Sequence, residues 1–392
     1  MAAVTLQSDM DFVRQLKETG GHKLKECYQC ATCSVACPMA PDNKPFPRKE
    51  MVWASFGLKE KLAGDIDLWL CHNCGNCSDL CPRDAGPAEL MSSARDLIYR
   101  DMIKPRLIGE WMSKPSGLLP LFLIPAIIWF IVWWIRASLV GSWFPRSADG
   151  RIVYGSIFSG DYTIDPIFMI TFFGAAFILA HGCRKLLRKF KPEGKLAVIG
   201  KKRSWIACLF EVLWEEVGSA SKFSQCEEGP ATGEPHKTRR FSHTILVWSF
   251  CILTFVTTVV AIGHWGGKII PAILIETPMP QGFWVKIVAN IGAILMTIAL
   301  IMLTWRRATL NKHQASNYYD WYLLGIIWAV TITGIFSQIF RLMNWIHWAF
   351  IIYYLHLVVV WMLFAYVPWS KLGHFVYRTA AMVYARMYGR SY

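Results

Sequence analysis

Six apolar segments are the sequence feature that most constrains how this chain can fold. They cover approximately residues 117–139, 166–183, 242–263, 284–305, 321–340 and 347–369. Each is close to the ~20 residues that an α-helix needs to cross the hydrocarbon core of a bilayer. Because the backbone finds no water there, we expect all six to be transmembrane helices. Their length, tryptophan-rich ends and scarcity of charge disfavour the alternative, buried helices of a soluble protein.

The basic residues are concentrated in the loops on one side of these segments. The formal net charge is +14, yet residues 1–112 carry 14 Lys/Arg against 15 Asp/Glu. The excess therefore lies in the membrane half, above all in the loop at 184–240. The positive-inside rule then predicts a cytoplasmic (inner) membrane protein with both termini in the cytoplasm. Such loops face anionic membrane lipid, and no nucleic-acid-binding motif accompanies the charge.

Two cysteine runs precede the first apolar segment, and both read C-x2-C-x2-C-x3-C-P. They begin at Cys27 and Cys71 and end at Cys37 and Cys81. This is the bacterial spacing for a pair of [4Fe-4S] clusters, in which the fourth cysteine of each run binds the other cluster. The pattern predicts two ligand sets: Cys27, Cys30, Cys33 and Cys81 for cluster one, and Cys71, Cys74, Cys77 and Cys37 for cluster two.

Two alternatives explain these cysteines less well. Zinc sites also use C-x2-C pairs, but zinc does not account for the complete four-cysteine pattern with its proline appearing twice. Disulfides require an oxidising compartment, and nothing before the first run resembles a secretion signal. We therefore interpret the cysteine runs as the ligands of a two-cluster electron carrier in a reducing compartment.

The fold class that follows is mainly α, in two domains. Residues 1–112 are predicted to form a two-cluster, α-helical ferredoxin-like domain, and residues 113–392 a six-helix transmembrane bundle. In the first domain we expect helices at 9–20, 47–63 and 85–112. Within the long basic loop, residues 205–217 (WIACLFEVLWEEV) could lie flat on the membrane or against a partner.

Histidines at the ends and inside the apolar segments suggest what the membrane half does. His243 and His264 bracket the third segment, while His356 lies inside the sixth and His374 follows it by 18 residues. On one continuous helix, 18 residues are five turns, which would place His356 and His374 on one face. Any single histidine can be structural, but a histidine within a bilayer is a functional candidate.

The predicted topology pairs these histidines by depth as ligands of two b-type haems. The inner pair is His243 with His374, and the outer pair is His264 with His356. His347 at the outer end of the sixth segment and His181 at the inner end of the second are rival ligands.

Both halves resemble known families. The stretches CYQCATCSVACP and CHNCGNCSDLCP resemble the iron–sulfur subunit of heterodisulfide reductases, which exchanges electrons with a flavin-bearing partner. The last five apolar segments resemble the membrane cytochrome b subunit of respiratory nitrate reductases, in the tail VPWSKLGHF and the interval from His356 to His374.

The second resemblance also covers GHW at 263–265 and VK at 285–286. In that family a lysine near the outer haem contacts the quinone, so the resemblance implies a quinone-binding role for Lys286. A lysine at a helix start can also simply extend to the membrane surface. The chain departs from that family in the spacing of the histidines in its third segment.

The combination of the two halves resembles the membrane-bound C component of the quinone-interacting (quinone-modifying) oxidoreductase complex of sulfate-reducing microbes. This resemblance implies flavin- and iron–sulfur-containing A and B subunits as partners, menaquinone as the membrane substrate and adenylylsulfate reductase as the downstream acceptor. Two alternatives remain open: a membrane subunit of a related complex with another soluble partner, and a cluster-bearing membrane anchor without a quinone site. Either direction of electron flow is compatible with the residues.

Overall fold

The computed structural model of the chain describes residues 7–41, 44–193, 203–221, 237–275, 277–309 and 318–390. Within these ranges all regular structure is helical, and six helices are long and apolar enough to cross a membrane. These candidate spans are Pro115–Val140, Gly160–Phe190, Arg240–Gly267, Trp284–Thr309, Tyr318–Leu342 and Ile346–Ala365. The predicted fold class, a mainly α protein with six transmembrane helices, is confirmed.

The N-terminal region consists of short helices that surround the cysteine runs. They are α1 (Met10–Thr19), α2 (Thr32–Val35), α3 (Arg48–Ser55), α4 (Lys59–Gly64), α5 (Asp67–Leu70), α6 (Asn76–Asp79), α7 (Pro87–Met102) and α8 (Arg106–Met112). The predicted helix at 9–20 is confirmed as α1, whose first turn is capped by the Asp9 carboxylate accepting from the Phe12 N–H at 2.8 Å.

Two predicted helices of this region are each broken in two. The segment 47–63 divides into α3 and α4 at Gly57, whose φ of +66° is a left-handed conformation that a helix cannot continue through. The segment 85–112 divides into α7 and α8 before Pro105, because proline excludes the helical conformation at the residue before it. The breaks allow the chain to fold back around the cysteines.

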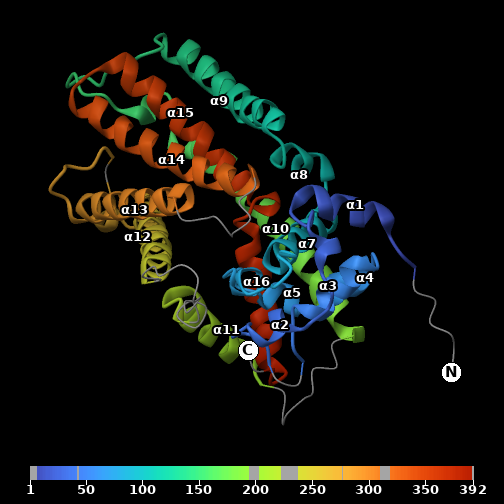
Figure 1. Cartoon of the computed structure of the whole chain (residues 1–392). Helices are drawn as coiled ribbons and strands as arrows, with labels where there is room; N and C mark the ends of the chain where they lie inside the picture. Colours follow the sequence, from blue (N-terminus) through green and yellow to red (C-terminus); the bar gives the residue numbers. More distant parts are fainter. Residues whose placement is uncertain are drawn as a thin grey trace.

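The membrane-spanning helices pack as neighbouring hairpins with α10 among them. They are α9 (Leu118–Val140), α10 (Asp165–Glu193), α12 (Lys237–Gly267), α13 (Trp284–Thr309), α14 (Tyr318–Leu342) and α15 (Ile346–Ala365). Helix α12 runs along α13 and α14 along α15, while α15 also contacts α9 and α10 (Figure 1). The basic loop predicted at 184–240 lies partly outside the described residues.

The sixth span ends earlier than the sequence suggested. Helix α15 stops at Ala365, a short 3₁₀ turn, η8, covers Val367–Trp369, and a separate helix α16 (Gly373–Met387) follows. The physical reason is Pro368, which has no backbone N–H and restricts Val367 before it. The expectation that His356 and His374 share one face of a continuous helix is therefore wrong.

Helix α16 connects the membrane bundle to the N-terminal region. It packs against α10 and α5 (Figure 1). The Arg378 Nε donates to the Trp69 carbonyl oxygen at 3.2 Å, and Arg390, just beyond the helix, forms an ion pair with Asp67. The two ends of the described chain thus lie on the same side of the bundle, as an even number of spans requires. That this side is cytoplasmic stays a prediction.

A buried charge cluster surrounds the Arg390 contact. The carboxylates of Glu50, Asp65 and Asp67 lie within 4.8 Å of one another. Lys49 forms ion pairs with all three, at 3.4 Å to Glu50 and 3.2 Å to Asp65. Burial and the neighbouring Asp65 carboxylate raise the pKa of Glu50 well above its ordinary value. With Glu50 protonated, two carboxylates face two cations, so the cluster is neutral without a metal ion.

The raised pKa of Glu50 predicts how folding stability changes with pH. The folded chain retains the Glu50 proton to a higher pH than the unfolded chain, so folding stability falls as pH rises from the ordinary carboxyl range through the raised pKa. Glu50→Gln keeps a neutral side chain of the same shape and removes that loss. Its melting temperature, relative to the unmodified protein, should rise by a few degrees from about pH 5 to about pH 8.

Thermal unfolding followed by circular dichroism at both pH values measures the effect. The control is Glu110→Gln, which changes an exposed glutamate and should leave the difference between the two pH values unaltered. A melting temperature of the Glu50 variant that falls relative to the unmodified protein at the higher pH would show that Glu50 is ionised in the folded chain.

Candidate iron–sulfur centres and membrane histidines

The eight motif cysteines line two cavities, four to each. The first cavity is lined by Cys27, Cys30, Cys33 and Cys81, and the second by Cys37, Cys71, Cys74 and Cys77. Counted together with their openings to solvent, the cavities measure about 330 and 360 Å³. In both, one cysteine comes from the other run, so the structure brings together the two sets that the spacing predicts. That they bind iron stays a prediction.

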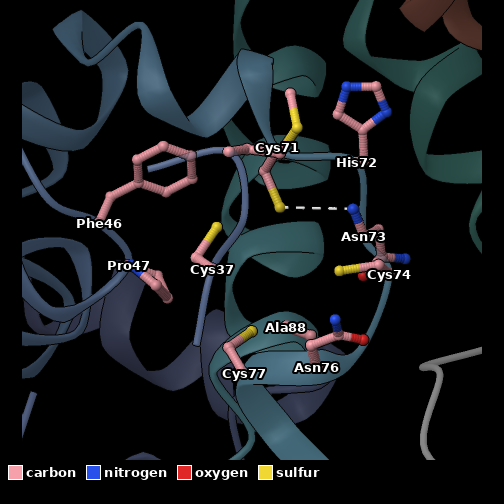
Figure 2. Close-up of a pocket in the computed structure, with 11 residues that line it drawn as sticks. Cys37, Phe46, Pro47, Cys71, His72, Asn73, Cys74, Asn76, Cys77 and Ala88 are labelled. Atoms are coloured by element: carbon pink, nitrogen blue, oxygen red, sulfur yellow. Dashed lines mark hydrogen bonds between the residues drawn. The ribbon is translucent and has the colours of Figure 1, made fainter. Parts of the chain in front are cut away.

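The second cavity shows how the fold assembles one set. Cys71 and Cys74 lie on the loop between α5 and α6, Cys77 lies on α6, and Cys37 reaches the cavity from the other run, with its sulfur directed toward the same space (Figure 2). The rest of the wall is largely apolar and includes Phe46. Such a wall limits the access of water, which is one of the factors that determine the reduction potential of a cluster.

The two cysteine loops repeat the same backbone conformation. Gln29 and Ala31 have φ of +66° and +71°, and the corresponding Asn73 and Gly75 have +52° and +97°. Left-handed residues are uncommon outside glycine and persist where the surroundings impose them. Successive backbone N–H groups in such turns form concave sites for anions, including iron–sulfur clusters. The repeated conformation therefore fits an anionic cofactor in both cavities.

Polar hydrogens near the sulfurs fit the same cofactor. The Asn73 N–H donates to Cys71 Sγ at 3.4 Å (Figure 2), and the Ala85 N–H to Cys81 Sγ at 3.3 Å. Hydrogen bonds of this kind to ligand sulfurs help to set cluster potentials.

The burial of the thiols determines what metal ligation by them would require. Burial raises the pKa of Cys33 to about 11 and that of Cys37 to about 12. Metal ligation requires the thiolate, so deprotonation at these positions needs a strongly positive partner such as iron. A hydrogen bond with the Thr32 hydroxyl lowers the pKa of the more exposed Cys30. The donor set, its N–H groups and its burial therefore fit [4Fe-4S] clusters.

The two cavities face different parts of the molecule. At the first, Cys30 is exposed and the neighbouring Tyr28 side chain is 58% exposed. At the second, the carbonyl oxygen of Cys71 accepts from Arg95 Nη2 at 3.0 Å. Fully buried Trp69, two residues earlier, stacks on Tyr377 of α16 with ring centroids 5.8 Å apart. The second cavity thus lies toward the membrane bundle and the first toward solvent.

Among the predicted haem ligands, His374 lies in the contact between α16 and the N-terminal region. Its Nε2 is 3.4 Å from Asp96 Oδ1, and its ring centroid is 4.5 Å from that of Tyr99 and 6.1 Å from that of Trp69. Burial lowers the pKa of His374 and raises that of Asp96, which favours the neutral form of both. Enclosed in this way, the ring has the surroundings of a core residue, and its Nε2 atom makes no hydrogen bond to the part of the chain that the structure describes. The role of His374 as an inner haem ligand stays a prediction.

His264 lies in a polar cluster at the opposite end of the bundle. Its Nε2 is 2.6 Å from Asp161 Oδ1, on the π-helical turn η4 (Gly160–Ile164), and Lys268 Nζ is 2.5 Å from the same oxygen. Next to it, the Trp265 indole donates to Asp165 at 2.8 Å. The Nε2 atom of His264 is therefore already hydrogen-bonded, and these contacts join α12 to the start of α10.

His356 has the surroundings that best fit a metal ligand. Its Nδ1 is 3.0 Å from Thr333 Oγ1 of α14, and its ring lies over Gly334, where a Cβ atom would approach the ring to 3.1 Å. Metal-binding histidines commonly use the second ring nitrogen in such a hydrogen bond, which orients the ring. Because Nδ1 of His356 takes part in this hydrogen bond, Nε2 is the ring nitrogen that would bind a metal ion.

The remaining candidates are placed as follows. His243 is half-buried in the first turns of α12, and Lys286 is half-buried in the first turn of α13. The rivals are both exposed: His181 lies inside α10, and His347 lies in the first turn of α15. Helix α12 packs extensively on α13 and not to a comparable extent on α15 or α16 within the described ranges. Direct helix packing does not test either predicted haem pair, because a haem would lie between the two helices, so both pairs stay predictions.

Sequence reasoning missed the acidic partners of these histidines. Asp161 and Asp96 are 103 and 278 residues away from His264 and His374 in the chain, and neither lies in a recognisable motif. Asp161 belongs to a segment before the second span, where an acidic residue is unremarkable. Nothing in the sequence pattern could have identified them.

Comparison with known proteins finds relatives of the cysteine-rich region and of the chain that follows it. Residues 23–85 match the 4Fe-4S dicluster domain family. The chain is 33% identical over 88 residues to the C component of the H(2):CoB-CoM heterodisulfide,ferredoxin reductase of Methanothermobacter marburgensis, covering 22% of this chain and 48% of the relative. It is 36% identical over 120 residues to the C2 component of the H(2)/formate:CoB-CoM heterodisulfide,ferredoxin reductase of Methanococcus maripaludis, covering 28% and 65%.

These matches span about half to two thirds of the length of those relatives and confirm the predicted likeness to heterodisulfide reductase iron–sulfur subunits. Another relative extends over the membrane part as well: citrate utilization protein B of Escherichia coli is 25% identical over 329 residues, which are 80% of each chain. No solved structure matches the chain. Residues 195–391, just over half of the chain, match the family of citrate utilization protein B, and the chain therefore belongs to that family, with a 4Fe-4S dicluster domain near its N-terminus.

Proposed function

We propose that this chain is the membrane subunit of an electron-transfer complex that links quinone in the bilayer to soluble redox subunits. The observation that carries the proposal is the convergence of four cysteines on each of two cavities, with the second cavity packed against helix α16. When bound, each [4Fe-4S] cluster supplies one-electron transfer. The chain's own part is to hold, space and shield these cofactors.

The orientation of the two sets suggests an order. The set of Cys37, Cys71, Cys74 and Cys77 lies on the membrane side, because Trp69 and Arg95 join its loop to α16 and α7. The set of Cys27, Cys30, Cys33 and Cys81 includes the exposed Cys30. Soluble partners would exchange electrons at the first set, and the membrane half at the second. The proposed division at residue 112, between α8 and the first span, follows the same boundary.

The family resemblances of the sequence imply specific partners, and we include them in the proposal. Menaquinol would give up two electrons and two protons, and flavin- and iron–sulfur-containing A and B subunits would receive the electrons and supply adenylylsulfate reductase in sulfate respiration. The likeness to the iron–sulfur components of heterodisulfide reductases supports soluble partner subunits. The cytoplasmic location of the cluster region and of both termini belongs to this proposal.

Two b haems, with the inner pair His243 and His374 and the outer pair His264 and His356, remain a prediction from sequence. The contacts of His356 with Thr333 and of His264 with Asp161 each occupy one ring nitrogen, as is common for metal-binding histidines. Lys286, half-buried at the start of α13, remains the proposed quinone-binding residue. A lysine there can donate a charge-assisted hydrogen bond to a quinone oxygen.

A second candidate follows from the Escherichia coli relative, which matches 80% of this chain and takes its name from citrate utilization. In that case the soluble partner would oxidise a carboxylic acid substrate, and this chain would carry the electrons to the quinone, in the opposite direction. The same cysteine sets serve both directions. Identification of the subunits that co-purify with the chain distinguishes the two candidates.

Single cysteine substitutions test the two ligand sets. Cys30→Ser should impair the cluster of the first cavity and Cys74→Ser that of the second, because each removes one thiolate from one set. Electron paramagnetic resonance of the reduced protein should show one cluster signal lost or altered in each variant and the other retained. Cys208→Ser, at a buried cysteine outside both cavities, is the control. Unchanged signals in both motif variants would refute the ligand assignment.

A substitution also tests the quinone-binding role of Lys286. Lys286→Ala should slow quinol oxidation about tenfold, as expected for the loss of one charge-assisted hydrogen bond, and should leave the visible spectrum unchanged. Turnover with a soluble menaquinol analogue and an artificial acceptor measures the effect. Arg151→Ala, which removes an exposed cation paired with Asp149 in the loop after the first span, is the matched control. Equal turnover in the Lys286 variant and the unmodified protein would remove this lysine from the site.

The proposal as a whole is tested by a redox titration of the purified protein, with visible absorbance and cluster resonance recorded together and with menaquinol analogue as reductant. We expect two cluster signals and two haem steps that the quinol reduces. A single haem step would support His356 and require another partner for it. Clusters without haem, and without reduction by quinol, would leave a cluster-bearing membrane anchor.

A further inference from the structure

A short amphipathic element between the second and third spans presents an apolar face to the outside. It comprises helix α11 (Trp205–Val212) and the π-helical turn η5 (Leu213–Gly218), and we call residues 205–218 the surface element. Its exposed face consists of Trp205, Ile206, Phe210, Leu213 and Trp214. Phe210 and Trp214 are each 69% exposed, whereas Cys208 and Val212 on the opposite face are fully buried. Large apolar side chains this exposed indicate an interaction surface.

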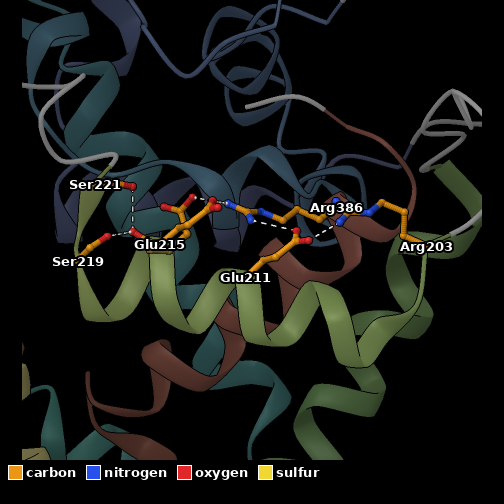
Figure 3. A network of polar contacts seen from close by, with 7 residues as sticks. Arg203, Glu211, Glu215, Ser219, Ser221 and Arg386 are labelled. Carbon is orange, nitrogen blue, oxygen red and sulfur yellow. Dashed lines mark hydrogen bonds and ion pairs between the residues drawn. The ribbon is translucent and has the colours of Figure 1, made fainter.

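The acidic residues of the surface element contact arginines, and their exposure differs: Glu216 is buried, Glu211 is partly exposed and Glu215 is half-exposed. Arg386 of α16 forms ion pairs with Glu215 at 2.7 Å, Glu216 at 3.1 Å and Glu211 at 3.4 Å, and Arg203 pairs with Glu211 (Figure 3). Three carboxylates thus meet two arginines, which neutralise most of their charge. The half-exposed Glu215 next to Trp214 is paired with Arg386, so it repels an anionic surface less than a free carboxylate would.

Two hydrogen bonds place the surface element at the edge of the membrane. The Trp248 indole donates to the Gly218 carbonyl oxygen at 3.1 Å, and Arg240 Nε donates to the Ser219 carbonyl oxygen at 3.1 Å. Arg240 and Trp248 belong to the first turns of the third candidate span, which begins at Arg240. The end of the surface element thus lies at the depth where that span enters the bilayer. Phe241, 57% exposed, extends the apolar surface onto α12.

Cations flank the surface element on the same side of the bundle. The last turns of α10 carry Arg184, Lys185, Arg188 and Lys189, and Arg203 directly precedes the surface element. Basic residues at this depth attract anionic headgroups, at about 1 kcal/mol each near the surface. A helix with tryptophan and phenylalanine on one face and paired charges on the other is typical of elements that lie in the plane of the interface.

We propose that the surface element binds the anionic surface of the bilayer, with its apolar face inserted among the lipid acyl chains. A second copy of the chain or a soluble subunit is the less favoured occupant, because the depth fixed by α12 already places this face beside lipid. The proposal rests on the membrane-spanning fold and does not depend on the proposed electron transfer.

The proposed contact also holds the second cysteine set in position. Helix α16 contacts the surface element through Arg386 on one side. On the other side, Arg378 binds the Trp69 carbonyl oxygen of α5, just before Cys71. The surface element, α16 and the cysteine loop therefore form one connected series of contacts. Binding to lipid would fix the position of the second cavity relative to the membrane surface.

Photocrosslinking of the full-length protein tests the proposal. A p-benzoylphenylalanine replaces Phe210 in one variant and Trp214 in another, and the protein is reconstituted in vesicles of phosphatidylcholine with or without phosphatidylglycerol. Mass spectrometry after illumination should detect lipid adducts at both positions, in several-fold higher yield with phosphatidylglycerol. The same probe at Tyr28, exposed on the N-terminal region, is the control and should give almost none.

Three results would overturn the proposal. A crosslinked dimer as the main product at Phe210 and Trp214 would identify a second copy as the occupant. Lipid yields no higher than at Tyr28 would show that the apolar face does not contact the bilayer. Equal lipid yields with and without phosphatidylglycerol would exclude the anionic headgroup. Because the two positions are substituted separately, a folding defect in one variant does not prevent the test.

Discussion

The contact between helix α16 and helix α5, just before Cys71, is the interaction on which the arrangement of this protein depends. Trp69 is fully buried there, with its ring against Tyr377 and its carbonyl oxygen bound by Arg378. Because α16 follows the last span directly, the contact sets where the second cysteine cavity lies relative to the bilayer. A cluster domain joined to the membrane only through the chain before α9 would have no such fixed position.

Buried charges in this structure are paired with groups from distant parts of the chain. Asp67 meets Arg390, and Arg386 meets three glutamates of the surface element. Isolated burial of such groups would cost several kcal/mol, so each pair forms only when both regions are in place. The pairs therefore specify one docked arrangement of the C-terminus more than they add stability, and they link the membrane surface to the cysteine region through α16.

Much of the fold was predictable, because its signals are local. The length of the apolar segments and the scarcity of water in a bilayer predicted six helices, and a repeated cysteine spacing predicted two ligand sets. Helix ends were less predictable where a single residue ends the helix. Gly57, Pro105 and Pro368 each interrupt a helix that was expected to continue. The histidine predictions went furthest beyond the local signal, since the partners of a histidine come from distant parts of the chain, as Asp161 does for His264 and Asp96 for His374.

The sequence by itself determined the chemistry available to this protein: eight thiols in two crossed sets, six helices for a bilayer and a basic loop beside it. Spacing and hydrophobicity act over a few residues, so they can be read from the chain directly. The tertiary structure alone decided that the second set faces the membrane bundle, that His374 is enclosed beside Asp96, and that the acids at 211–216 pair with Arg386. Those outcomes depend on contacts between residues more than a hundred positions apart, which no local pattern encodes.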